Sequence, residues 1–374
     1  MVLPPYPHNV LRAFRALDRG SPFACMCSLG RFDASLMSPS LCGWRRMTTS
    51  VRAMRVARRG LCQQREKWAA LVEEPVAEGR RVQRRAACPV HIIPLSAGLR
   101  KIRGLGWVDP IELVAGAAYG EEFEIPKTQK MVTRLPLRLP ELTRGLIRGA
   151  QTISTKDAGY ITARLGIGSG DRILEAGLGS GGLAVHVGRC LGSSGLHVTV
   201  EPHAKHTEVG LANMQRARES WLEFPRHHHV EGALEEVVPQ VEALSHEYDG
   251  IILDLPGHER AIAASAPLLA VGGRLACYCP VTSQVEAAWD ACTAAGLEVE
   301  WAGELIEREW GRASKGGIRP VNGPFGHTAF LLIAQRKRIY APPCAAPVHA
   351  PAKRTGSLAQ RLFPLLFGSG STHG

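Results

Sequence analysis

Short apolar runs alternate with amphipathic segments through the middle of the chain. Two of the amphipathic segments, at 183–187 and 262–269, have the spacing of helices, and the apolar runs lie at 172–174, 196–200, 248–253 and 272–279. Alternation of this kind predicts βαβ units and a parallel sheet. Right-handed crossovers would place the residues that follow each run along one edge of that sheet. We therefore expect a Rossmann-like α/β fold.

The segments on either side of this pattern differ in composition. Residues 91–150 hold short alternating pieces such as 122–125 between Gly-rich turns, which predicts a small N-terminal β domain. The α/β domain is expected over residues 151–338. The tail, residues 339–374, is rich in Pro, Ala, Ser and Gly, which predicts flexibility. Residues 1–90 are predicted to be a basic, disordered or transit-like segment.

The formal charge of +11 is concentrated at the N-terminus. Residues 1–100 hold 17 Lys and Arg against 6 Asp and Glu, whereas residues 101–374 hold 28 of each kind. An Arg-rich, acid-poor start is typical of an organelle transit peptide, which would indicate a mitochondrion or another organelle; otherwise the cytoplasm is expected. The alternatives are an unstructured basic arm, residues upstream of the true start codon, or an arm that binds RNA phosphates.

Other compositional features argue against several classes of protein. No run approaches 18 consecutive apolar residues, so no membrane span is predicted. The ten cysteines lack the paired C-x-x-C spacing of zinc sites, which favours a reducing compartment without structural disulfides. The run His227-His228-His229 has no acid or cysteine partner in the sequence pattern, and a solvated loop is favoured there over a metal site. No metal is predicted.

The segment Ile173–Gly181 carries the strongest chemical signal. Glu175 is followed by Gly177, Gly179 and Gly181 at a spacing of two. Glycine tolerates positive φ and lets a ligand approach the backbone, and a glycine turn after the first strand of a doubly wound sheet is a nucleotide-cofactor site. The spacing differs from the G-x-G-x-x-G of dinucleotide sites. It resembles the first motif of S-adenosylmethionine (SAM)-dependent methyltransferases, the alternative being a glycine turn of another α/β protein.

Two acids end later apolar runs. Glu201 lies 20 residues after Gly181 and ends the second run, where an acid can accept both ribose hydroxyls of a nucleoside. Its alternative is a surface acid. Asp254 ends the third run and is followed by Leu255-Pro256. Its alternative is an acid that caps the next helix.

Further segments resemble one methyltransferase family. They are Gln151–Ile161 with Lys156-Asp157-Ala158-Gly159-Tyr160, Asp254-Leu255-Pro256 with Pro280–Val285, and Arg308-Glu309-Trp310 with Arg319-Pro320 and Gly326–Leu331. Together they resemble the tRNA (adenine-N1)-methyltransferases that modify position 58 in the T-loop. The resemblance covers about residues 95–338. Lys-Asp-Ala-Gly-Tyr and Gly-His-Thr-x-Phe-Leu are its most specific parts.

The resemblance implies a fold, a reaction and partners. It implies a small β domain before a SAM-binding Rossmann-like domain, SAM as cofactor, tRNA as substrate and assembly as a homotetramer. It also implies a catalytic acid, which falls on Asp254. Adenine N1 has an in-plane lone pair and attacks the methyl group without a strong base. The acid would instead accept a hydrogen bond from the N6 amine and stabilise the charge that develops on the ring.

The remaining site residues are expected by position. SAM-binding residues are expected to be Gln151, Glu175, Gly177, Gly179, Ser180, Gly181 and Glu201. Among them Glu175 is expected either to meet the methionine ammonium or to order the glycine turn. Substrate-binding residues are expected to be Gln284, Arg308, His327 and Thr328. A structural histidine is the alternative for His327, and a solvated charge for Arg308.

Some positions depart from the family pattern, and two rival functions remain. The departures are Leu178, Ser154, Ala233 and Gly257-His258. One rival is another SAM-dependent methyltransferase, acting on a protein or a small molecule, which leaves the block 308–331 unexplained. The other rival is a non-catalytic RNA-binding subunit of a methyltransferase complex. The retention of the three glycines, Glu201 and Asp254 argues against that second rival.

Overall fold

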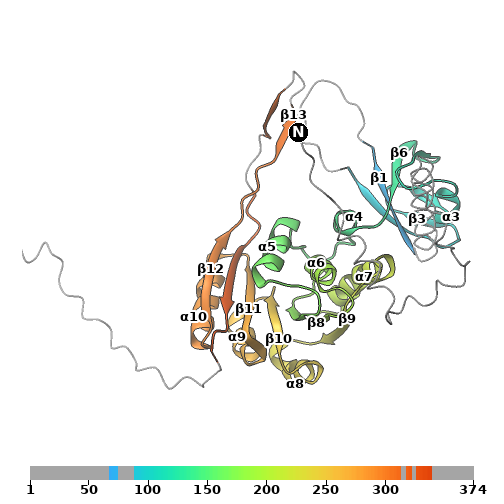
Figure 1. Ribbon diagram of the computed structural model, residues 1–374. Helices are drawn as coiled ribbons and strands as arrows, with labels where there is room; N and C mark the ends of the chain where they lie inside the picture. The colour runs from blue at the N-terminus through green and yellow to red at the C-terminus, as the bar shows by residue number, and fades with distance from the viewer. Residues whose placement is uncertain (1–66, 75–87, 313–316, 322–325, 339–374) are drawn as a thin grey trace, which may run out of the picture. The chain divides into compact units, whose positions relative to one another are not determined.

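The computed structural model describes residues 67–74, 88–312, 317–321 and 326–338, all within one compact unit, Arg65–Gly374. The predictions for the Arg-rich segment before Lys67 and for the tail, residues 339–374, therefore lie outside the described residues. At the centre of the unit is a seven-stranded sheet with the order β12-β15-β11-β10-β7-β8-β9 (Figure 1). Its strands are β7 Arg172–Ala176, β8 Leu196–Glu201, β9 Arg226–Glu231, β10 Tyr248–Leu253, β11 Leu269–Cys279, β12 Glu298–Glu304 and β15 Phe330–Gln335.

Helices cover both faces of this sheet (Figure 1). Successive strand side chains point to opposite faces, so Ile173 packs with α5 and α6, whereas Leu174 packs with α8, α9 and α10. Because both faces are buried, the central strands are apolar at almost every position, which is why they are visible as runs in the sequence. The helices are α5 Thr155–Leu165, α6 Gly182–Leu191, α7 Ala204–Ser220, α8 Leu234–Leu244, α9 His258–Ser265 and α10 Thr282–Ala294, with the short 3-10 helix η3 Ala266–Leu268 after α9.

The strand order creates a switch point between β7 and β10. From β7 the chain moves outward through β8 to β9, then returns to place β10 on the other side of β7. The four predicted strands, now β7, β8, β10 and β11, are parallel as predicted. β9 is also parallel to β8, although a loop was predicted at 227–229. β12 and β15 were not predicted as strands, and β15 pairs antiparallel with both β11 and β12. It follows β12 through a hairpin connection, which requires opposite strand directions.

A smaller antiparallel sheet, β2-β1-β6-β5, precedes the large one. Its strands are β1 Trp68–Glu73, β2 Val90–Pro94, β5 Glu122–Ile125 and β6 Lys130–Leu135. The chain between β2 and β5 forms the hairpin strands β3 Arg100–Ile102 and β4 Gly106–Val108 and the helix α3 Pro110–Leu113, and α4 Leu139–Arg144 follows β6.

β1 lies inside residues 1–90, which the sequence predicts to be disordered or cleaved. It pairs with both β2 and β6, and Ala69, Ala70 and Leu71 are completely buried. The high Arg content around it concealed a six-residue strand. The Trp68 indole Nε1 also donates to Glu219 Oε2 of α7 at 2.7 Å, so this strand is joined to the seven-stranded sheet through α7.

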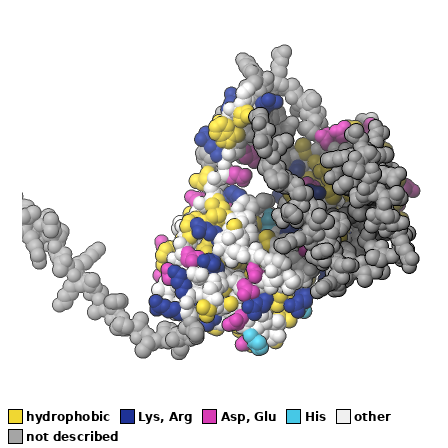
Figure 2. Space-filling view, viewed as in Figure 1, with side chains coloured by type: hydrophobic (Ala, Val, Ile, Leu, Met, Phe, Trp, Pro, Cys, Tyr) yellow, Lys and Arg dark blue, Asp and Glu magenta, His cyan; other side chains and the backbone are white. Residues whose placement is uncertain are grey.

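Other outcomes concern smaller elements. The run His227–His229 lies within β9 and not in the predicted loop. β13 Trp310–Arg312 and β14 Ile318–Pro320 form a hairpin between β12 and β15 that exposes Trp310 and Ile318. Figure 2 shows basic and acidic side chains interspersed over the visible described surface. Within that described part, no helix has the length and apolar character to cross a membrane.

Candidate active site

The glycine turn and Asp254 are in direct backbone contact at the switch point. β7 ends at Ala176, and its carbonyl accepts a hydrogen bond from the Asp254 N–H at 2.8 Å. Gly177 has φ +97°, and a Cβ added there would lie 1.9 Å from the carbonyl oxygen of Asp254. Because no side chain fits in that space, glycine at 177 is what allows the first turn and Asp254 to lie side by side.

The other two glycines have different surroundings. Gly181 has φ +72°, and an added Cβ would approach the Gly210 carbonyl oxygen of α7 to 2.9 Å. Gly179 has φ +52°, and an added Cβ would meet only the Ala150 side chain, at 3.6 Å. Gly181 therefore permits close packing of α7, whereas the backbone at Gly179 is nearly uncovered. Backbone that a ligand can approach closely is what a nucleotide cofactor site requires after the first strand.

Glu201 ends β8 and reaches back to the same turn. The carboxylate is almost completely buried; its Oε2 accepts from the Gly179 N–H at 3.0 Å, and its Oε1 accepts from the His203 N–H at 3.1 Å. Burial alone would raise the pKa of Glu201, but the hydrogen bonds from Gly179 and His203 outweigh it and lower the pKa. The side chain is thus a fixed, ionised acceptor.

Asp254 differs from Glu201 in having no donor. Among the described residues, no group donates a hydrogen bond to its half-buried carboxylate. Burial raises its pKa to about 7, and the ionised carboxylate of Glu201 contributes to the shift. A carboxylate at a cofactor-type edge that lacks an internal partner is available to accept a hydrogen bond from a bound molecule.

Glu175 is engaged beneath the turn. Its Oε2 lies 2.9 Å from His197 Nε2 of β8, and both side chains are fully buried. Burial raises the pKa of Glu175 to about 8 and lowers the pKa of His197 to about 3. The Glu175 carboxyl is therefore engaged by His197, and its contact with a methionine ammonium, direct or through water, stays a prediction. His197 was not among the predicted site residues.

The loop before α5 is held against the glycine turn. The Ser180 hydroxyl donates to the Ala150 carbonyl at 2.8 Å and accepts from the Gly149 N–H at 3.0 Å. Asn213 of α7 fixes the same loop through two hydrogen bonds to Ile147, at 3.0 and 2.8 Å. Gln151 directly follows Ala150, and its side chain is exposed. These contacts place Gln151 beside the turn, whereas Asn213 gave no signal in the sequence.

A polar cluster joins the start of α5 to the loop before β15. Lys156 Nζ donates to Asp157 Oδ1 and to Thr328 Oγ1, each at 2.7 Å. The Ser154 hydroxyl caps α5 and donates to Asp157 Oδ2 at 2.8 Å. Thr328 was a predicted site residue; Lys156 was seen only as part of a motif. The cluster brings together the two motifs that are most specific for the resemblance.

The other predicted substrate residues are more scattered. His327 Nδ1 lies 2.9 Å from Glu304 Oε2 and its Nε2 lies 3.2 Å from the Pro280 carbonyl oxygen. Both partners are acceptors, and the bonds to Glu304 and then Pro280 raise the pKa of His327. Gln284 is on α10, where its buried Oε1 has no partner among the described residues. Arg308 is exposed between β12 and β13.

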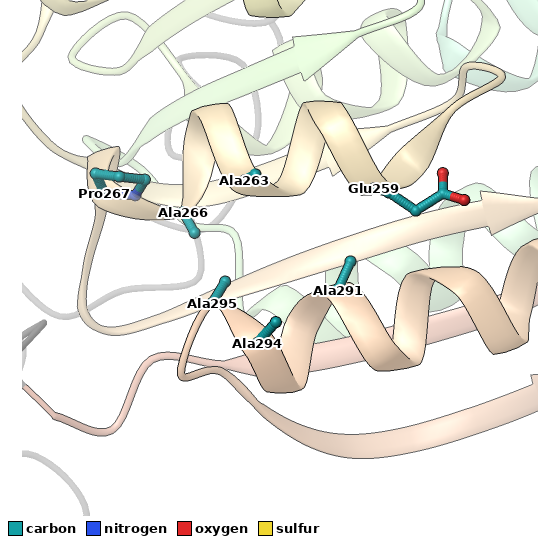
Figure 3. Close-up of a pocket in the computed structure, with 7 residues that line it drawn as sticks. All are labelled: Glu259, Ala263, Ala266, Pro267, Ala291, Ala294 and Ala295. Atoms are coloured by element: carbon teal, nitrogen blue, oxygen red, sulfur yellow. The ribbon is translucent and has the colours of Figure 1, made fainter. Parts of the chain in front are cut away.

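A hollow of about 320 Å³ elsewhere on the sheet lacks this chemistry. Figure 3 shows it between α9 and α10, where Ala263 and Ala266 face Ala291 and Ala294. Glu259 at one end is the only charged residue in its lining, and no predicted site residue contributes to it. The strand-end cluster around Gly179, Glu201 and Asp254 is therefore the candidate site.

Comparisons with known sequences point in one direction. A family model described as the tRNA methyltransferase complex GCD14 subunit matches residues 137–311. The tRNA (adenine(58)-N(1))-methyltransferase TrmI of Thermus thermophilus is 34% identical over 205 residues, which cover 53% of this chain and 74% of that protein. The tRNA (adenine(57)-N(1)/adenine(58)-N(1))-methyltransferase TrmI of Methanocaldococcus jannaschii is 26% identical over 212 residues, covering 52% and 75%.

Solved structures share the fold. A SAM-dependent O-methyltransferase from Thermotoga maritima superimposes with a TM-score of 0.57 at 22% identity, covering 72% of this chain and 92% of that one. The tRNA (m1A58) methyltransferase TrmI from Aquifex aeolicus gives a TM-score of 0.53 at 16% identity, covering 72% and 97%. The predicted Rossmann-like α/β fold with a small N-terminal β sheet is thus confirmed.

Proposed function

The chain belongs to the TrmI/TRM61 family of SAM-dependent tRNA (adenine-58-N1)-methyltransferases, and from this premise we propose that it methylates N1 of adenine 58 in the T-loop of tRNA. SAM, when bound, supplies an electrophilic methyl group on a sulfonium sulfur. The target N1 carries its own lone pair, so the protein has no need of a strong base to create the nucleophile. Its contribution lies in positioning and in charge stabilisation.

Asp254 is the residue to which we assign the stabilising role. The observation that supports it is a half-buried carboxylate at the switch point without a hydrogen-bond donor from the described chain. An N6 amine of adenine could donate to it, and that bond strengthens as N1 becomes alkylated and the ring becomes positive. Guanine carries O6 at the corresponding place and cannot donate, so the same carboxylate discriminates between the two purines.

The cofactor residues follow from the geometry of the turn. We assign the ribose diol to Glu201, because its carboxylate is ionised and lies at the end of β8. The backbone of Gly177, Gly179, Ser180 and Gly181 would line the methionine end, with Gln151 beside it. Gly179 supports this assignment, since its backbone is left open to a ligand and an added Cβ would meet only the Ala150 side chain.

The test is nucleoside mass spectrometry of tRNA incubated with the protein and isotopically labelled SAM. The expected product is N1-methyladenosine at position 58, formed by the wild type and by Asp290→Ala, a control at an exposed acid on α10. Asp254→Ala should form none above background. Methylation of another base, or of added protein, would favour a different SAM enzyme. SAM binding without any transfer would favour a non-catalytic subunit.

Assembly as a homotetramer and location in an organelle also stand as proposals. The exposed Trp310 and Ile318 of the β13–β14 hairpin are compatible with contacts between copies. Light scattering after size-exclusion chromatography reads out the number of copies directly. A monomer that methylates tRNA at full rate would argue against the tetramer without affecting the proposed reaction.

A further inference from the structure

Three potential metal ligands gather where β8 passes into α7. Glu201 ends the strand, His203 is the N-cap residue of the helix, and His206 lies one helical turn later. One ligand atom from each side chain lies within 4.8 Å of the others. The metal candidate in the sequence pattern is the run at 227–229, whereas this cluster forms because a strand-end acid and two histidines at spacing three meet at one turn.

The distances suit a small tetrahedral ion. The Glu201 Oε1 atom lies 2.9 Å from His203 Nδ1 and 3.6 Å from His206 Nδ1. Zinc bound at about 2.0–2.2 Å by tetrahedral ligands separates those ligands by about 3.3–3.6 Å. The Glu201–His206 distance already agrees with that range, whereas the Glu201–His203 distance is shorter, so a small rotation of the His203 side chain would suffice. Two histidines and one carboxylate with an open fourth position are the ligand set of known zinc sites.

We propose that Glu201, His203 and His206 form a binding site for a divalent transition-metal ion such as Zn²⁺, and that the ion competes with SAM. The second half rests on the proposed function, in which Glu201 holds the ribose. Glu201 Oε2 accepts from the Gly179 N–H and Oε1 accepts from the His203 N–H, so the second lone pair of Oε1 would bind the ion. A ribose diol needs the same carboxylate, so the two ligands exclude each other at Glu201.

Access and ligand chemistry determine which ions qualify. The side chains of His203 and His206 are 69% and 37% exposed, so an ion can enter from solvent. Imidazole ligands favour zinc, copper and nickel. Mg²⁺ prefers six oxygen ligands in an octahedral arrangement, and the cluster offers one carboxylate. Mg²⁺ added to fold tRNA should therefore not bind at this site.

The first experiment measures Zn²⁺ binding to the full-length protein without RNA or SAM, by competition with a chromogenic zinc indicator. The variants are His203→Gln, His206→Gln and, as a matched control, His228→Gln, whose side chain is exposed on β9. Removal of either histidine should lower the affinity for one equivalent of zinc by at least about tenfold, and the control should have the affinity of the wild type. Unaltered zinc binding in both ligand variants would overturn the site. Thermal unfolding checks that the variants remain folded.

The second experiment measures SAM affinity by calorimetry with and without Zn²⁺. In the wild type, saturating zinc should weaken SAM binding at least about tenfold, while Mg²⁺ has no effect. His206→Gln should bind SAM equally with and without zinc. An equal loss in both proteins would mean that zinc binds SAM itself, and would refute competition at Glu201. Zinc binding by a protein that never methylates tRNA would uphold the metal site and count only against the proposed reaction.

Discussion

Glu201 and Asp254 lie at the ends of β8 and β10, the two strands that flank β7. Their hydrogen-bonding surroundings differ. At the end of β8, Glu201 accepts hydrogen bonds from Gly179 and His203, and its pKa is lowered despite burial. At the end of β10, Asp254 has no donor within the described chain, and burial raises its pKa to about 7. Burial acts in the same direction on both, so hydrogen-bond donors decide the difference. Glu201 is therefore a permanently ionised acceptor for a ligand, whereas the ionisation of Asp254 depends on the ligand that binds beside it.

The largest effect is expected from removing the unpartnered acid. Asp254→Ala should lower the rate of methyl transfer to tRNA by at least about 100-fold, because a group that stabilises developing charge is lost. SAM affinity should remain within about threefold of wild type, since the ribose and methionine contacts are elsewhere. Single-turnover kinetics and calorimetry measure the two quantities. Turnover equal to wild type would refute the role assigned to Asp254.

The matching change at the other acid should act on binding. Glu201→Gln removes an ionised acceptor, and SAM affinity should fall by about 10- to 100-fold. Glu208→Gln, at an exposed acid on α7, serves as the control and should bind SAM like the wild type. Calorimetric titration with SAM provides the measurement. A Glu201 variant that binds normally but transfers slowly would reverse the division of labour between the two acids.

The raised pKa of Asp254 predicts a pH dependence of catalysis. Only the ionised carboxylate carries the negative charge that stabilises the ring as it becomes positive, so kcat/KM should rise about tenfold per pH unit below about 7 and level off above it. The positive charge of bound SAM should shift the corresponding limb of kcat to lower pH. Initial rates on one tRNA at a series of pH values give both profiles. A rate that does not change between about pH 5.5 and about pH 8 contradicts the prediction.

The same pKa predicts an effect on stability with a definite sign. A folded-state pKa of about 7 exceeds the ordinary value of 3.8, so the protonated form favours the folded protein at low pH, and this contribution is lost as the pH rises through about 7. Asp254→Asn should therefore raise the free energy of unfolding at about pH 8 by roughly 1–3 kcal/mol, with a smaller gain at about pH 5. Chemical denaturation at the two pH values tests this.

The smallest effect is expected at Glu201. Its lowered pKa keeps it ionised throughout the neutral range, so SAM affinity should change by no more than about twofold between about pH 5.5 and about pH 7. Calorimetry at both ends of that range is sufficient. A steep loss of affinity over this interval would show that Glu201 lacks the electrostatic setting inferred from its contacts with Gly179 and His203.

The sequence predicts those parts of the site that follow from strand order and glycine turns. It does not predict contacts between side chains that are distant in the sequence. Gly177, Glu201 and Asp254 were placed together because parallel strands end at one edge. The Glu175–His197 pair depends on which residues of β7 and β8 share a face, which requires the register. Lys156 and Thr328 are 172 positions apart, so no local pattern could pair them. The direction of β15 follows from a hairpin whose two strands resemble the other apolar runs.

The N-terminal sheet was the least visible part of the fold. β1 is short, its neighbours in the sequence are basic, and its partner β6 lies about 60 residues later, as in the pairing of Ala70 with Leu135. Composition averaged over residues 1–90 therefore described the Arg-rich part and hid the strand. A deletion that ends at residue 90, designed on composition alone, would remove a strand with pairing partners on both sides.

That strand sets a boundary for maturation. If a peptidase removes an Arg-rich leader in an organelle, we expect its cut to fall upstream of Trp68. A cut within or beyond β1 would remove an inner strand of the small sheet, together with the indole that bonds to α7. Any processed N-terminus is therefore expected upstream of Trp68, and Edman sequencing of the purified native protein would locate it.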